Sequence, residues 1–196
     1  MNELKVIGFT GPKRSGKDTA ADALVRELGW VKVNPGDPIR AMTKALLRHH
    51  FDTYSEEMID AHVDGDLRET PILHIFGKDI SARHMMQTLG DDWGRALIHP
   101  DLFACMMHTA VAKALWRGAP GVVITGIRKP NEARMVRMLD GELWRIKRPG
   151  FEATGEHTSE QGLDDLPVTA TFVNDGSPED LQRQVLQLAP RQGRPS

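Results

Sequence analysis

The sequence has little of what marks an exported, disulfide-stabilised or membrane-spanning protein. It holds one cysteine, Cys105, which excludes an internal disulfide and a structural zinc site built from cysteines alone. No segment approaches the roughly 18 apolar residues that a membrane span requires, and the N-terminus lacks the uninterrupted apolar stretch of a signal peptide. These absences predict a soluble, unexported protein of a reducing cytoplasm, with no membrane partner.

Neither sign of charge is in large excess. The 25 Lys and Arg residues nearly balance the 27 Asp and Glu residues, and the net charge of −2 gives no overall attraction to DNA, so direct nucleic-acid binding is not expected. The eight histidines show no HExxH or comparable ligand spacing. A chain of 196 residues fits one domain, which we place at residues 1–188, followed by a polar, frayed tail at 189–196.

The sequence does contain short strand-like segments that alternate with helix-forming ones, and two of them, 4–9 and 122–125, are apolar almost throughout. The expected strands are 4–9, 30–33, 122–125, 143–147 and 170–173. The expected helices are 18–28, 39–50, 83–89, 102–116, 130–139 and 178–188. Unbroken apolar strands are typical of a parallel sheet covered on both faces, so the alternation predicts an α/β fold with a mainly parallel sheet. The middle region, 34–118, reads as mostly helical.

A glycine-rich motif lies between the first predicted strand and the first predicted helix. Residues 11–17 read GPKRSGK, which fits the pattern GxxxxGK in the strand–loop–helix context of a phosphate loop. Glycines let consecutive N–H groups face inward, and Lys17 supplies a point charge for the β- and γ-phosphates of ATP. A flexible turn with an exposed lysine is the plainer alternative, which the context disfavours. The expected ATP contacts are Gly11, Lys13, Arg14, Ser15, Gly16, Lys17, Asp18 and Thr19.

The residue after the motif lysine is unusual. Asp18 stands where the usual pattern has a Ser or Thr that binds Mg²⁺, and the hydroxyl comes one place later, at Thr19. A carboxylate here can approach Mg²⁺ directly or through water, but it also repels phosphate oxygens. We therefore expect Mg²⁺ near Asp18 and Thr19, with the direct hydroxyl contact left open.

Seven segments in order resemble the bacteriophage deoxynucleoside monophosphate kinases. They are GPKRSGKDTAAD in the phosphate loop, DPIR (37–40), RHMMQTLGDDWGR (83–95), VVITGIRKPNEA (122–133), IKRPG (146–150), HTSE (157–160) and VNDGS (173–177). The resemblance implies a P-loop NTPase three-layer α/β/α fold with a helical substrate-binding lobe at 34–118 and a short lid at 149–166. It also implies transfer of the γ-phosphate of ATP to a deoxynucleoside monophosphate, in the host cytoplasm if a phage encodes the chain.

One position departs from that family. Its members usually carry an Asp at the end of the third core strand, and this chain has Gly126 there. A carboxylate that would help to anchor Mg²⁺ is therefore missing. Asp18, water or the nucleotide itself has to take over, since Mg²⁺ needs only one or two protein carboxylates.

Phosphoryl transfer needs cations around the migrating group more than it needs a base. The acceptor phosphate has a second pKa of about 6 and is largely ionised at neutral pH. Arg128 follows the third core strand and Arg148 follows the next, at the edge of the sheet where ligands bind. An arginine at a strand end is often only a solvated charge, but the resemblance makes Lys17, Arg128 and Arg148 the candidate catalytic residues.

Candidate acceptor-binding residues follow the second strand and the central helices: Asp37, Arg40, Arg68, Arg83, Gln87 and Arg95. On a helix, Arg83 and Gln87 share one face, which lets an arginine hold a phosphate while an amide reads a base edge; a surface pair is the plain alternative. Asn174, after the last strand, fits either an adenine pocket or a turn. His157 lies in the expected lid.

Two other functions stay open. A dephospho-coenzyme A kinase has a similar fold but phosphorylates a hydroxyl, which needs a base, and Asp37 is placed for that role. A P-loop ATP switch or nucleic-acid-associated NTPase usually has a Walker B carboxylate or a basic stripe, and neither is clear here. Trp93, Trp116 and the methionine-rich helices fit a core or a subunit interface, so a homodimer is also open.

Overall fold

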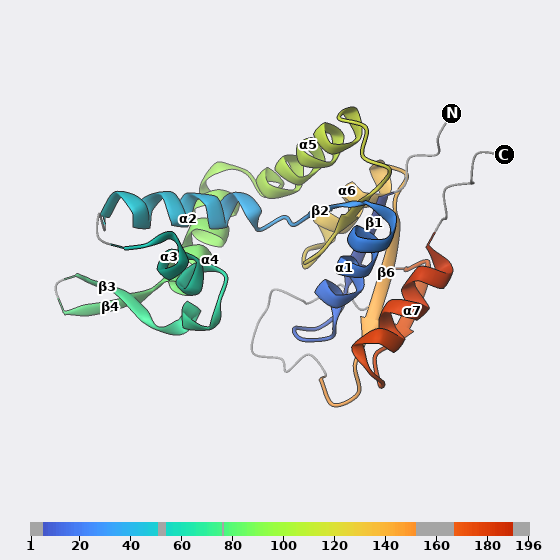
Figure 1. The fold of residues 1–196 in the computed structure, drawn as a ribbon. Helices are drawn as coiled ribbons and strands as arrows, with labels where there is room; N and C mark the ends of the chain where they lie inside the picture. The colour runs from blue at the N-terminus through green and yellow to red at the C-terminus, as the bar shows by residue number, and fades with distance from the viewer. Residues whose placement is uncertain (1–5, 51–53, 76, 152–166, 190–196) are drawn as a thin grey trace. The chain divides into compact units, whose positions relative to one another are not determined.

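The computed structural model describes residues 6–50, 54–75, 77–151 and 167–189 (Figure 1). The chain forms two compact units, one of Met1–Pro35 with Ala104–Ser196 and one of Gly36–Phe103. Each unit has its own buried apolar core. Within the described ranges, none of the helices combines the length and apolar character needed to cross a membrane.

The first unit is built on a five-stranded sheet in the order β2-β5-β1-β6-β7, and all its pairings are parallel. Its strands are β1 (Val6–Thr10), β2 (Val31–Val33), β5 (Val122–Ile124), β6 (Glu142–Lys147) and β7 (Ala170–Val173). The predicted parallel α/β architecture is confirmed. Because β1 lies at the centre, the loop that leaves its carboxyl end lies at the middle of the ligand-binding edge.

Helices cover both faces of this sheet, which makes three layers. They are α1 (Lys17–Leu28), α5 (Leu102–Trp116), α6 (Pro130–Met138) and α7 (Pro178–Leu188). Alternate residues of β1 point to opposite faces: Ile7 and Phe9 pack with α1 and α7, which lie side by side in Figure 1, whereas Val6 packs with α5 and α6. Ala189, which the sequence analysis assigned to the tail, is 4% exposed and packs in the first of these cores.

The second unit combines helices with a hairpin. Its elements are α2 (Asp37–His50), α3 (Glu56–Val63), the 3-10 helix η1 (Asp66–Glu69), β3 (Pro71–Ile75), β4 (Lys78–Ser81), α4 (Ala82–Gln87) and the π-helix η2 (Thr88–Ile98). The antiparallel β3–β4 pair was not predicted from the sequence. Its two strands are short, and only Ile72 and Leu73 are buried, so the alternation that signals a strand is too brief to detect.

The π-helix η2 depends on two buried glycines. A Cβ added at Gly94 would lie 2.4 Å from Cε2 of Phe103, and one at Gly90 would lie 3.0 Å from Cδ1 of Ile39. Any larger residue would push these side chains away. The predicted helix at 83–89 is therefore continued to Ile98 by a wider helix that packs through its glycines.

Candidate functional site

The loop between β1 and α1 takes a conformation that requires glycine at two positions. Gly11 has φ +138° and Gly16 has φ +106°. A Cβ at Gly11 would lie 2.2 Å from the Ile146 carbonyl oxygen, and one at Gly16 would lie 2.6 Å from Nδ2 of Asn174. Backbone conformation and close packing thus both select the two glycines of the motif.

Lys17 is the first residue of α1, and its side chain lies along the loop. Its Nζ donates to the carbonyl oxygens of Gly11 (2.7 Å) and Pro12 (2.6 Å). The residue that precedes the helix, Gly16, offers no side chain to cap the N–H groups of the first turn. A helix N-terminus with uncapped N–H groups and an adjacent ammonium group favours a bound anion.

A cavity of about 340 Å³ opens at this loop. Its lining residues are Arg14, Ser15, Gly16, Lys17, Asp18, Thr19, Arg148, Asn174, Gly176 and Pro178. Two side chains that follow β6 and β7 donate hydrogen bonds to the backbone of the loop. Arg148 Nη1 donates to the Arg14 carbonyl oxygen (3.1 Å), and Asn174 Nδ2 donates to the Ser15 carbonyl oxygen (2.8 Å). The Arg148 guanidinium also lies 4.5 Å from the ring centroid of Phe151.

The structure thus gathers most residues expected to contact ATP, and Arg148, around one cavity. The sequence analysis did not predict Gly176 and Pro178 as lining residues, although it noted the turn after Asn174 in which this segment begins. Arg128 does not line this cavity; its side chain is exposed, and its backbone N–H donates to Oε2 of Glu132 (2.8 Å). The expected lid lies mostly outside the described residues, and His157 lies wholly outside them.

The two residues expected near Mg²⁺, Asp18 and Thr19, both line the cavity. The Asp18 carboxylate is exposed and lies 3.9 Å from Nζ of Lys32, and Thr19 adds a hydroxyl. Carboxylate and hydroxyl oxygens suit a hard cation such as Mg²⁺. Among the residues that the structure describes, no group of three or more His, Cys, Asp or Glu side chains forms a ready-made metal site.

Gly126 has a structural reason to be glycine in this chain. Its φ is +78°, and an added Cβ would lie 2.8 Å from Nδ2 of Asn34. That amide nitrogen donates to Oγ1 of Thr125 (3.1 Å), which follows the neighbouring strand. The Asn34 amide therefore occupies the space into which a side chain at position 126 would extend.

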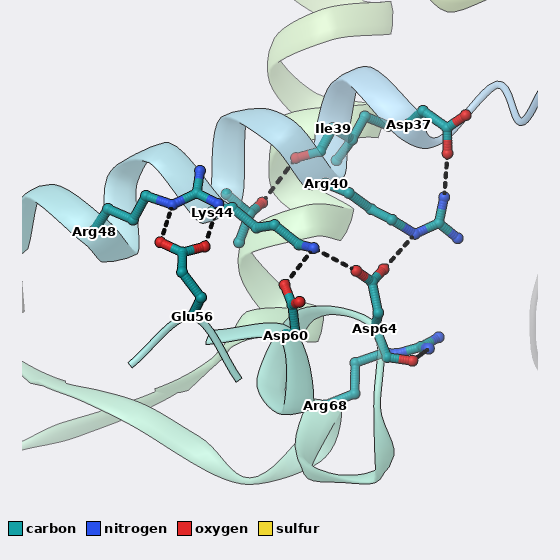
Figure 2. Close-up of polar contacts among 10 residues, drawn as sticks. Asp37, Ile39, Arg40, Lys44, Arg48, Glu56, Asp60, Asp64 and Arg68 are labelled. Atoms are coloured by element: carbon teal, nitrogen blue, oxygen red, sulfur yellow. Dashed lines mark hydrogen bonds and ion pairs between the residues drawn. The ribbon is translucent and has the colours of Figure 1, made fainter. Parts of the chain in front are cut away.

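In the second unit, three of the residues expected to bind the acceptor are joined through Asp64 (Figure 2). Arg40 pairs with Asp37 (Nη1 to Oδ1, 3.2 Å) and with Asp64 (Nε to Oδ1, 3.0 Å). Arg68 Nη2 donates to the backbone oxygen of Asp64 (2.6 Å). Asp37, Arg40 and Arg68 thus form one polar network whose centre, Asp64, the sequence analysis missed.

The remaining expected acceptor residues lie on α4 and η2. Arg83 pairs with Glu69 (Nη1 to Oε1, 3.0 Å), the residue that follows Arg68, and Gln87 ends α4 one turn later. Arg95 pairs with Asp91 (Nη1 to Oδ1, 2.9 Å), and its guanidinium lies 5.1 Å from the ring centroid of Phe103.

The sheet order, the glycine-rich loop and the cavity at its edge define a nucleotide-binding protein with a P-loop α/β/α fold. The model of the family described as deoxynucleotide monophosphate kinase matches residues 69–185, more than half of the chain, and the chain belongs to this family. It is an ATP-dependent nucleoside monophosphate kinase.

The matches to individual proteins cover different shares of this chain. A relative from Acanthamoeba polyphaga mimivirus, whose name assigns it provisionally to the deoxynucleotide monophosphate kinases, is 29% identical over 93% of this chain and 95% of its own. The cytidylate kinase of Edwardsiella ictaluri is 31% identical over 63% of this chain, a match that spans 56% of that enzyme. The solved structure of shikimate kinase from Aquifex aeolicus has 14% identity and a TM-score of 0.48, over 93% of this chain and 94% of that one.

Proposed function

We propose that this enzyme transfers the γ-phosphate of ATP to a deoxynucleoside monophosphate and releases ADP and the deoxynucleoside diphosphate. The cavity at the phosphate loop supports this proposal most strongly. Lys17, the first residue of α1, lines the cavity, and Arg148 reaches the same loop from the end of β6. Two cations and uncapped helix N–H groups are the arrangement that stabilises a triphosphate and the charge of its transfer.

The reaction then requires little covalent chemistry from the protein. An ionised oxygen of the acceptor phosphate attacks the γ-phosphorus, and the bond from that phosphorus to the oxygen bridging the β-phosphate breaks. ADP leaves with the electron pair, so the acceptor needs no general base. Lys17 and Arg148 would offset the charge on the migrating group. Arg128, in the segment that follows β5, is proposed as a further cation.

Asp18 and Thr19 are the residues proposed to hold Mg²⁺, directly or through water. Mg²⁺ bound with the nucleotide supplies positive charge to the β- and γ-phosphates. Asn174 is proposed to line the nucleotide site because its amide is held against the loop backbone at Ser15.

For the acceptor, we propose contacts with Asp37, Arg40, Arg68, Arg83, Gln87 and Arg95. The family match and the mimivirus relative support a deoxynucleotide acceptor, and the cytidylate kinase likeness makes dCMP and CMP the acceptors to compare first. The ordered motifs resembling the phage kinases support a bacteriophage origin, with the reaction in the host cytoplasm.

A coupled ADP-release assay across dTMP, dGMP, dCMP and dAMP, with the ribonucleotides as controls, tests the proposal. Turnover that depends on a deoxynucleoside monophosphate supports it. ATP hydrolysis that ignores all monophosphates but rises with DNA would instead support a nucleic-acid-associated NTPase. The variant Asp37→Asn distinguishes a hydroxyl acceptor from a phosphate acceptor. Loss of kcat with unchanged KM would indicate that Asp37 is the general base for a hydroxyl, whereas an effect mainly on KM favours a phosphate acceptor.

A further inference from the structure

Asp64, the residue that follows α3, contacts three cationic side chains from two other elements (Figure 2). Its Oδ1 accepts from Nε of Arg40 (3.0 Å) and its Oδ2 lies 2.7 Å from Nζ of Lys44. Its backbone oxygen accepts from Nη2 of Arg68 (2.6 Å). One short segment thus holds cations from α2 and from η1.

These contacts are partly shielded from water. The side chains of Arg40 and Lys44 are 31% and 20% exposed, and that of Asp64 is 42% exposed. Arg68 also has a buried Nε without a hydrogen-bond partner in the described structure. A buried unpaired guanidinium donor beside a carbonyl-anchored Nη2 is the kind of group that an incoming anion satisfies.

Lys44 offsets the negative charge that Asp64 brings to this region. Hydrogen bonds from Lys44 to Asp60, and then to Asp64, raise the pKa of the Lys44 ammonium, so it stays protonated at neutral pH. The Asp64 carboxylate can therefore orient Arg40 while its own charge is partly offset by Lys44, which also pairs with Asp60.

We propose that Asp64 is a positioning residue for the acceptor phosphate. Its carboxylate fixes the guanidinium of Arg40 and its carbonyl fixes that of Arg68, so that less side-chain entropy is lost when the phosphate binds. The inference rests on the proposed function, in which both arginines bind the deoxynucleoside monophosphate.

Asp64→Asn tests the proposal because it keeps the size of the side chain and the backbone carbonyl but removes the charge that holds Arg40. We expect KM for the best deoxynucleoside monophosphate to rise about fivefold to tenfold, within the range for one hydrogen bond that is partly exposed to water, with kcat and KM for ATP changed less than about twofold. Asp60→Asn is the matched control: Asp60 pairs with Lys44 but has no ion pair with Arg40, so KM should change less than about twofold.

A double-mutant cycle shows whether Asp64 acts through Arg40. In an Arg40→Ala background, Asp64→Asn should leave KM almost unchanged. Equal KM increases for Asp64→Asn and Asp60→Asn, or an undiminished effect in the Arg40→Ala background, would overturn the proposal.

Two further measurements decide the cases that these variants leave open. If Asp64→Asn does not fold, as judged by its circular dichroism spectrum, the Arg40 Nε–H NMR signal of the wild type replaces it: slow exchange with water supports an anchored guanidinium, and fast exchange contradicts it. If the wild type itself shows no turnover with any deoxynucleoside monophosphate, the proposed function fails, which differs from wild-type turnover with no specific effect at Asp64.

Discussion

The position of the Lys17 side chain depends on the shape of the phosphate loop. Its ammonium lies against two carbonyl oxygens of the loop because Gly11 and Gly16 turn the backbone where other residues would be strained. Its charge is thereby kept beside the uncapped start of α1.

Lys17→Ala should lower kcat/KM by about 10²- to 10³-fold, or roughly 3–4 kcal/mol of transition-state stabilisation, the range seen when one key electrostatic donor is lost. The measurement is the coupled assay, with circular dichroism to show that the variant is folded. Arg183→Ala, which removes an exposed cation outside the cavity, is the control and should retain activity. Near-normal turnover of Lys17→Ala would contradict the proposed position of the γ-phosphate.

Gly126→Asp introduces the carboxylate that the resemblance to the phage kinases leads us to expect at this position, but it should not improve this enzyme. The new side chain would meet Nδ2 of Asn34, and φ is positive at this position, so we expect a loss of about 1–3 kcal/mol in the free energy of unfolding. Urea denaturation measures the free energy of unfolding of the variant, and the coupled assay measures its activity.

The double variant Gly126→Asp with Asn34→Ala should recover part of that loss, because the obstructing amide is gone. Asn34→Ala alone is its control. Higher activity of Gly126→Asp at unchanged stability would show that the side chain fits and binds the metal after all.

At the scale of elements, α7 supports the phosphate loop from outside the motif. Leu181 of α7 packs so close to Gly16 that a Cβ added there would lie 2.8 Å from its Cδ2. A capping box begins the helix: the Asp180 backbone N–H donates to the Ser177 hydroxyl oxygen (3.2 Å), and the Ser177 N–H donates to Oδ2 of Asp180 (3.1 Å).

Ser177→Ala should lower the free energy of unfolding by about 1 kcal/mol, the usual effect of losing an N-cap, and Gln187→Ala on the exposed side of α7 should change it much less.

The same capping box predicts how the free energy of unfolding depends on pH. Hydrogen bonds from the Ser177 hydroxyl, and then from its backbone, lower the pKa of Asp180 in the folded state.

The contribution of Asp180 is therefore present above the ordinary carboxyl pKa and is lost as the pH falls through the lower folded-state value. Urea denaturation from pH 7 to about pH 3 should show a smaller acid-induced loss in Ser177→Ala than in the wild type. Identical pH profiles would show that the Ser177 hydroxyl does not lower the pKa of Asp180.

At the scale of the whole molecule, the two units have separate cores and separate polar sites. The cavity at the phosphate loop is lined by residues of the first unit, whereas Ile59, 1% exposed, packs in the core of the second. A substitution that destabilises the core of the second unit should therefore weaken binding of the monophosphate more than binding of ATP.

Ile59→Ala should lower the free energy of unfolding of the unit Gly36–Phe103 by about 2–5 kcal/mol through the cavity that it leaves. We expect faster hydrogen exchange in that unit and a higher KM for the monophosphate, with ATP affinity little changed. Met58→Ala, at an exposed neighbour on α3, is the matched control. An equal loss of ATP affinity would show that the units do not act independently.

Local patterns predicted the features that depend on local chemistry. The five parallel strands, most helices and the glycine-rich loop were predicted because short apolar or β-branched runs, helix periodicity and the need for positive φ each act within a few residues. The β3–β4 hairpin and the π-helix were not found, since short, mostly exposed strands and glycine packing against Phe103 leave no periodic signal.

The parallel α/β class and the place of the phosphate loop can be predicted from the sequence alone, because both follow from residues adjacent in the chain. Which distant residues meet that loop depends on how the strands and helices pack. Arg148 and Asn174 reach it because the order of the strands brings the ends of β6 and β7 beside β1. Asp64 likewise joins Arg40 to Arg68 only through the packing of α2, α3 and η1, and contacts of this kind depend on three-dimensional proximity, which no local pattern encodes.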